Sequence, residues 1–146
     1  MKLFTIGFTQ KSAETFFNRL IDNGVGQIID IRLNPHGQLS GFAKQEDLPY
    51  FLDKLAGHCQ YLYLPILAPT KEILNQYRSD GNWAKYAVDF ERLMDERDIP
   101  NELDRSLFEN LPSCLLCSEA SSVKCHRRLV AERLAKFWPD VEVIHL

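Results

Sequence analysis

The densest group of reactive side chains lies in the last third of the chain, where Cys117-Ser118-Glu119 is followed after five residues by Cys125-His126-Arg127. Thiols, imidazoles and carboxylates are the side chains that proteins use as nucleophiles and general bases. A segment of helical period begins at this point, and the amides at a helix N-terminus bind anions and lower the pKa of a thiol. We therefore predict Cys125 as a nucleophile with His126 or Glu119 as its proton partner. The alternative is a thiol that only packs against the neighbouring strand.

A carboxylate and a guanidinium interrupt the apolar run 27–32, at Asp30 and Arg32. Residues two apart in a strand point to the same face, and each charge costs roughly several kcal/mol if it is buried without a partner. One interpretation is a structural ion pair, and the other makes Arg32 a donor to an anionic ligand, held in place by Asp30. Residues 124–136 hold five basic side chains and one acid, so we expect Arg127 and Arg32 to bind an anion together.

The four cysteines raise the question of metal and redox chemistry. Cys114, Cys117, Cys125 and His126 are four nominal zinc ligands, but residues 114 and 117 leave opposite faces of a strand and cannot both reach one ion. We therefore predict no four-ligand zinc site, and expect Cys59 and Cys114 to be buried apolar residues. Cys117 and Cys125 remain as a redox pair or as two ligands of an open metal site. The absence of a Cys-x5-Arg phosphate loop argues against phosphatase or rhodanese chemistry.

Five strand-length apolar runs must position these residues: 2–6, 27–32, 60–64, 113–117 and 141–145. Several contain adjacent apolar residues, which is typical of parallel strands covered on both faces. Segments of helical period lie between them: 13–24 after a Ser12 cap, 47–57, 70–77 with a Thr70 cap, 82–94 with an Asn82 cap, 104–109, and from Cys125 or His126 to Phe137.

This alternation predicts a single α/β domain over residues 1–146, a Rossmann-like three-layer sandwich with a mainly parallel five-stranded sheet in the order 3-2-1-4-5. In such sheets ligands bind beyond the carboxyl ends of the strands, at the switch point, here between the first and fourth strands. The residues predicted to face a ligand at this edge are Gly7, Thr9, Asp30, Arg32, Asn34, Cys117 and Arg127. The segment 34–43 is either a ligand cover or a plain connection.

The composition is that of a globular protein, with 146 residues, 45% of them apolar and 25% charged. A net charge of -3 argues against a protein whose whole surface binds duplex DNA, so any site for an anion must come from a local group of residues. No signal-like segment and no 18-residue apolar stretch is present, and we therefore expect a cytoplasmic protein with reduced thiols and no membrane association.

Taken together, several runs resemble the family catalogued as domain of unknown function 488: Phe4-Thr-Ile-Gly, Ile29-Asp-Ile-Arg with Asn34-Pro35, Gly41-Phe42-Ala43, Tyr63-Leu-Pro, Leu116-Cys-Ser-Glu, Cys125-His-Arg-Arg and Val143-Ile-His-Leu. The family pattern usually has a His-Ser pair where this chain has Phe8-Thr9, which leaves Thr9 as the matching hydroxyl. Carried over by position, the characteristic residues are Gly7, Asp30, Arg32, Pro35, Phe42, Cys117, Glu119, Cys125, His126 and Arg127. The resemblance implies a small bacterial or archaeal cytoplasmic α/β protein, and no established reaction.

The residues favour a protein that binds a phosphate-bearing ligand, a nucleotide or a nucleic-acid end, with transferase or hydrolase chemistry. A binding module without turnover, as part of a larger assembly or defence system, would use the same residues. A thiol redox protein that cycles Cys117 and Cys125 needs no anion. The sequence predicts neither the cofactor nor the oligomeric state.

Overall fold

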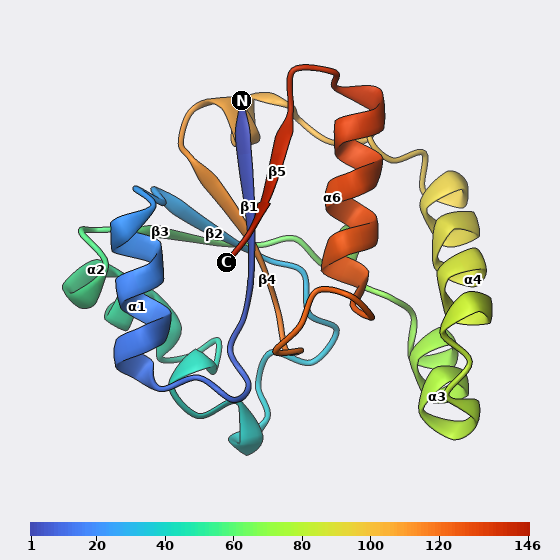
Figure 1. Cartoon of the computed structure of the whole chain (residues 1–146), viewed down its shortest axis with the longest axis horizontal. Helices are drawn as coiled ribbons and strands as arrows, with labels where there is room; N and C mark the ends of the chain where they lie inside the picture. Colours follow the sequence, from blue (N-terminus) through green and yellow to red (C-terminus); the bar gives the residue numbers. More distant parts are fainter.

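The computed structural model describes residues 1–146 and contains one sheet of five parallel strands. The strands are β1 (Lys2–Gly7), β2 (Gln27–Asp30), β3 (Gln60–Tyr63), β4 (Ser113–Cys117) and β5 (Glu142–His145). Helices cover both faces of this sheet (Figure 1). The predicted α/β class is confirmed, and each of the five apolar runs forms one strand.

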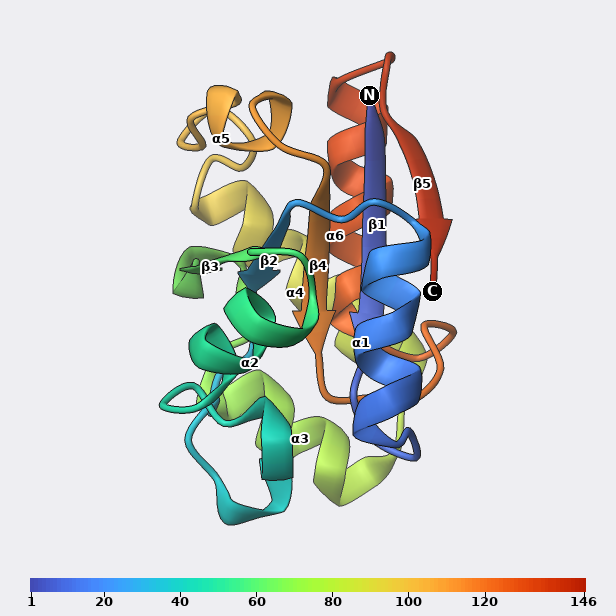
Figure 2. The ribbon, with the colours of Figure 1, turned by 90° about the vertical axis from the view of Figure 1, so that its left-hand side faces the viewer.

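The predicted strand order, 3-2-1-4-5, is wrong. The order is β3-β2-β4-β1-β5, so that β4 lies between β2 and β1 (Figure 2). Strand β4 is buried at all five positions, whereas β1 begins at exposed Lys2 and the edge strands β3 and β5 have no fully buried residue. The central place, with a strand on each side and helices on each face, is occupied by a strand with no exposed position. The connection from β1 to β2 consequently passes over β4, and the order is not that of the Rossmann-like arrangement we predicted.

Six α-helices connect the strands: α1 (Ala13–Asp22), α2 (Leu48–Leu55), α3 (Lys71–Asp80), α4 (Trp83–Glu96), α5 (Ser106–Glu109) and α6 (His126–Phe137). Short 3-10 turns occupy Gln38–Ala43 and Pro65–Leu67. The predicted caps Ser12, Thr70 and Asn82 each accept a hydrogen bond from an amide in the first turn of their helix. Helix α3 extends to Asp80, beyond the predicted end, because Gly81 at φ 62° provides the left-handed stop. No helix combines the length and the apolar character that a bilayer span requires.

The two faces of the sheet pack against different helices. In β4, Leu115 belongs to the core cluster built with α4 and α6, whereas Cys114 and Leu116 belong to the cluster built with α1 and α2. Cys117, one position after Leu116, points toward α6 and contacts His126. Cys114 and Cys117 therefore lie on opposite faces of the sheet, as their odd separation predicted.

The carboxyl ends of the three inner strands lie side by side. Gly7 at the end of β1 pairs with Cys117, and Asp30 at the end of β2 pairs with Leu116. Segments that are far apart in the sequence thus meet at one edge of the sheet, on either side of β4.

Candidate functional site

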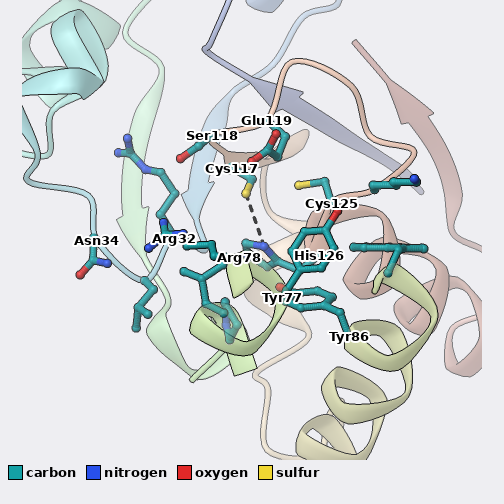
Figure 3. Close-up of a pocket in the computed structure, with 15 residues that line it drawn as sticks. Arg32, Asn34, Tyr77, Arg78, Tyr86, Cys117, Ser118, Glu119, Cys125 and His126 are labelled. Carbon is teal, nitrogen blue, oxygen red and sulfur yellow. Dashed lines mark hydrogen bonds between the residues drawn. The ribbon is translucent and has the colours of Figure 1, made fainter. Parts of the chain in front are cut away.

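A cavity of about 170 Å³ opens at this edge of the sheet. The ends of β2 and β4 form one side of it, and helices α3, α4 and α6 form the other (Figure 3). Its polar lining consists of Arg32, Asn34, Arg78, Cys117, Ser118, Glu119, Lys124, Cys125 and His126. The cavity therefore collects most of the reactive residues that the sequence singled out.

Cys117 and His126 form a close pair of reactive side chains in the cavity. Cys117 ends β4, His126 begins α6, and Cys117 Sγ lies 3.4 Å from His126 Nδ1 (Figure 3). The other ring nitrogen, Nε2, lies 2.8 Å from the carbonyl oxygen of Ile31. Because a carbonyl only accepts, Nε2 carries a proton and donates it to Ile31, while Nδ1 is the ring nitrogen that faces Cys117. Phe90 packs against the ring at a centroid distance of 5.6 Å, which further fixes its orientation.

Cys125 completes a compact cluster with this pair. It is the N-cap residue of α6, it is buried, and its sulfur lies within 4.8 Å of both Cys117 Sγ and a ring nitrogen of His126. A hydrogen bond from the Cys125 thiol is the main cause that lowers the pKa of Cys117, and the amides of Ser118 and Glu119 contribute in the same direction. Donating that hydrogen bond, together with burial, raises the pKa of Cys125. The position at the helix N-terminus predicted a lowered pKa for the Cys125 thiol, whereas its interaction with Cys117 and burial raise that pKa, and the role of Cys125 as a nucleophile stays a prediction.

Arg32 and Asp30 form a buried ion pair. Arg32 Nε lies 2.8 Å from Asp30 Oδ1, and Arg32 Nη2 lies 2.6 Å from Oδ2. Nη2 also donates to the carbonyl oxygen of Ala43 at 2.7 Å, and the Tyr61 hydroxyl donates to Asp30 Oδ2 at 2.6 Å. The guanidinium stacks over the Phe8 ring, which belongs to the core on the α1 side of the sheet, at 5.3 Å. This geometry matches the structural interpretation of the pair, and Arg32 borders the cavity without directing its charge at the cysteines.

Arg127 is likewise committed to the protein itself. It is 1% exposed, and its guanidinium donates to the carbonyl oxygens of Glu119 and Ala120. Its Nη1 also lies 3.6 Å from Cys125 Sγ. Arg127 thus fastens the loop after β4 to helix α6, and it does not line the cavity. Arg32 and Arg127, which we predicted to bind an anion together, donate most of their hydrogen bonds to other groups of the protein.

Gly7 and Thr9 hold the same loop from the β1 side. A Cβ atom on Gly7 would lie 1.6 Å from the carbonyl oxygen of Glu119, so only glycine fits there. Both the amide and the hydroxyl of Thr9 donate to the carbonyl oxygen of Ser118, at 3.1 and 2.6 Å. These two predicted ligand residues shape the loop and do not face the cavity.

Asn34 and Glu119 line the cavity with exposed side chains, so these two predicted residues are in position to meet a ligand. The segment that follows Asn34 is a connection anchored by buried Ser40 and Ala43, while Leu39 at its tip is 99% exposed.

Sequence reasoning missed the wall formed by α3 and α4. Tyr77, Trp83 and Tyr86 line the cavity, and the Trp83 and Tyr86 rings stack at a centroid distance of 5.1 Å. Arg78 on α3 and Lys124 before α6 add two exposed cations at the rim, and neither makes an ion pair. In the sequence these aromatic residues fit the periodicity of helices that face the core, so nothing marked them as part of a binding site. In the structure, however, no residue of α3 is fully buried. The one signal in the sequence was the composition of α3, which contains too few apolar residues for a helix that other parts of the protein cover completely.

Comparison with known proteins gives one match. A family model described as "Domain of unknown function DUF488" matches residues 12–134, a range that includes the entire Cys117–Cys125–His126 cluster. No curated protein and no solved structure matches the chain.

Proposed function

The chain belongs to the DUF488 family, whose description assigns no activity, and from its own residues we propose that it binds a phosphate-bearing ligand in the cavity at the carboxyl edge of its sheet. The thiols and the imidazole at the floor of this cavity then act on the bound ligand in a transfer or hydrolysis reaction.

The observation that carries the proposal is the position of two unpaired cations above a reactive cluster. Arg78 and Lys124 line the same cavity as Cys117 and His126. Glu119 is the only acidic side chain in the lining, and the charge of Arg32 is balanced by Asp30. The rim is therefore positive by one charge, and the N-terminus of α6 adds its unpaired amides and its dipole at the same place.

The aromatic wall indicates which phosphate-bearing ligands fit. Trp83 is half-buried and lines the cavity, so its ring is the one on which a nucleobase can stack, a contact worth about 1–3 kcal/mol per base, whereas Tyr86 is buried and already stacked with both Trp83 and Phe90. At about 170 Å³ the cavity is smaller than the roughly 300–1,000 Å³ typical of sites that enclose a drug-sized ligand. A terminal phosphate fits inside, whereas the rest of a nucleotide must extend along the rim. This favours the end of a nucleic acid, or a nucleotide bound by its terminal phosphate.

A binding measurement with matched oligonucleotides tests the proposal. A fluorescent trinucleotide with a 5′-phosphate and the same trinucleotide without it differ only in the group that the cavity is proposed to hold. We expect the phosphorylated form to bind at least about tenfold more tightly, since a charge-assisted hydrogen bond contributes about 1.5–3 kcal/mol. Equal affinity for the two forms would rule out a phosphate site.

Variants at the rim identify the cations responsible. Arg78→Ala and Lys124→Ala should each weaken binding by about 3- to 10-fold, the effect of a partly exposed cation on a phosphate. Lys71→Ala is the matched control, because it removes the same charge from an exposed position of the same helix as Arg78 but outside the cavity. An equal loss in Lys71→Ala would mean that general charge, and not this cavity, attracts the oligonucleotide.

A thiol redox role is the second candidate, and the proximity of two thiols favours it. In that role Cys117 and Cys125 join in a disulfide, releasing two protons and passing two electrons to an oxidant such as diamide. Mass spectrometry after diamide treatment would show a loss of two hydrogen atoms confined to the peptides that contain Cys117 and Cys125. A Cys117→Ser variant would abolish this change and leave oligonucleotide affinity within about twofold of wild type.

A further inference from the structure

Two thiols and one imidazole meet at the floor of the cavity, and all three side chains are buried. We propose that Cys117, Cys125 and His126 bind a zinc ion, with one coordination position left open toward the cavity. The inference goes beyond the proposed function, because it concerns the state of the cluster and stands whether or not the ligand carries a phosphate.

The spacing of the donor atoms suits a tetrahedral ion. With Zn–S and Zn–N bonds of about 2.3 and 2.0 Å, tetrahedral angles place a sulfur and a nitrogen about 3.5 Å apart and two sulfurs about 3.8 Å apart. Cys117 Sγ and His126 Nδ1 are 3.4 Å apart, and the donor atoms of all three residues lie within 4.8 Å of one another. Shifts of about 1 Å or less therefore bring the three atoms to coordination distances.

The imidazole is already oriented as a ligand. The ring donates through Nε2 to the carbonyl oxygen of Ile31, at 2.8 Å, so Nδ1 is the nitrogen directed at the cluster and available to a metal. Histidines that coordinate metals characteristically donate their other N–H to a carbonyl or a carboxylate, which fixes the tautomer.

The sulfurs are surrounded by donors. Arg127 Nη1 lies 3.6 Å from Cys125 Sγ, and the backbone of Ser118 and Glu119 contributes to the lowered pKa of Cys117. Two buried thiolates would carry a charge of -2, which a divalent cation neutralises. The combination of two thiolates and one imidazole favours zinc over calcium or magnesium, which prefer oxygen ligands.

The cavity supplies the open position. All three proposed ligands line it, so the side of the ion that they leave free faces the space bounded by α3 and α4. Zinc sites with three protein ligands and one exchangeable position are typical of catalysis, whereas purely structural sites use four protein ligands. The free position would hold a water molecule or an oxygen atom of the ligand.

Cobalt binding to the full-length protein tests the site directly. The reduced protein is dialysed against a chelator, transferred to chelator-free buffer without oxygen, and titrated with Co²⁺. We expect one equivalent to bind, with thiolate-to-cobalt charge-transfer absorption and the intense visible bands of a tetrahedral ion. Zn²⁺ should then displace cobalt at one equivalent. X-ray absorption of the zinc form should show two sulfur ligands at about 2.3 Å.

Substitutions assign the ligands. Cys117→Ser, Cys125→Ser and His126→Gln should each weaken zinc binding by more than about 100-fold, the upper end of the effect of losing a merely supporting partner. Cys59→Ala is the matched control, because Cys59 is a buried thiol in the core on the other side of the sheet. Its zinc affinity should stay within about twofold of wild type.

The wild-type titration decides the question even if the variants fold poorly. Absence of binding, a cobalt spectrum without thiolate charge transfer, or equal weakening by Cys59→Ala would each overturn the zinc site. Formation of a Cys117–Cys125 disulfide in protein that binds no zinc would replace it with the redox pair. Loss of phosphate discrimination with intact zinc binding would refute the proposed ligand and leave the metal site standing.

Discussion

Replacing Gly7 with alanine tests whether the loop after β4 is held against the end of β1 as closely as the structure indicates. The added Cβ would lie 1.6 Å from the carbonyl oxygen of Glu119 and 2.8 Å from Nη1 of Arg127. Separations under 3.0 Å are essentially never adopted by a Cβ atom, so the oxygen and the methyl group must separate by at least 3.0 − 1.6 = 1.4 Å. Neither neighbour is the free end of a flexible exposed chain, because the first is backbone and the second is a buried guanidinium.

The cost follows from what such a shift disrupts. Arg127 donates to the carbonyl oxygens of both Glu119 and Ala120, and hydrogen bonds from a charged group contribute about 1.5–3 kcal/mol each. Overpacking a close contact adds about 1–3 kcal/mol. Loss of one of these bonds together with the packing strain lowers the free energy of unfolding by about 2.5–6 kcal/mol, a large part of the roughly 5–15 kcal/mol available to a domain.

Urea denaturation followed by far-ultraviolet circular dichroism measures this change. Gly37→Ala is the control, since Gly37 has an ordinary φ of -61° and no atom within 4 Å of the added Cβ. It should leave the unfolding free energy within about 0.5 kcal/mol of wild type. A Gly7→Ala protein that loses less than about 1 kcal/mol would refute the close approach, and with it the loop position on which the cavity depends.

Four further predictions concern residues outside the cluster of Cys117, Cys125 and His126. Asp30→Asn should lower the unfolding free energy by about 3–5 kcal/mol, because it leaves Arg32 buried without its counterion; a loss below 1 kcal/mol in urea denaturation would contradict the buried pair. Tyr61→Phe removes one hydrogen bond to the same carboxylate and should cost about 1.5 kcal/mol in that assay. Burial raises the pKa of Cys59 to about 12, so at pH 8 the thiol stays protonated, and peptide mass spectrometry should find it unmodified by iodoacetamide until urea is added. Thr70→Ala removes the cap of α3 and should cost about 1 kcal/mol, whereas an unchanged midpoint would mean that α3 contributes nothing to the cooperative unit.

The helices and strands were predictable from the sequence because their signals are local. Ser12, Thr70 and Asn82 each stand just before an apolar stripe of helical period, and each caps its helix in the structure. The strand order was not predictable in this way. Residues 2–7 and 113–117 are apolar runs of similar length, and which of them lies at the centre depends on contacts between distant parts of the chain.

The meeting of Cys117, Cys125 and His126 was foreseeable, because a short loop between a strand and a helix returns the chain to the same edge of the sheet. The roles of Arg32 and Arg127 were not, since the direction of a guanidinium depends on which carbonyls and carboxylates the surrounding loops bring near it. Composition marks such a side chain as basic, but it does not distinguish one that clamps a loop from one that faces a ligand.

The central position of β4 has a consequence for the order in which the chain assembles. Strand β1 has only two neighbours, β4 and β5, and both are synthesised more than 100 residues after it. Strands β2 and β3 can pair as soon as residue 63 has been synthesised. Strand β1 can pair only after residues 113–117 of β4 have been synthesised, and such long-range pairing slows folding. During translation β1 therefore stays without a partner on the ribosome until β4 has been made, and the cavity forms only after residues 113–126 have been synthesised.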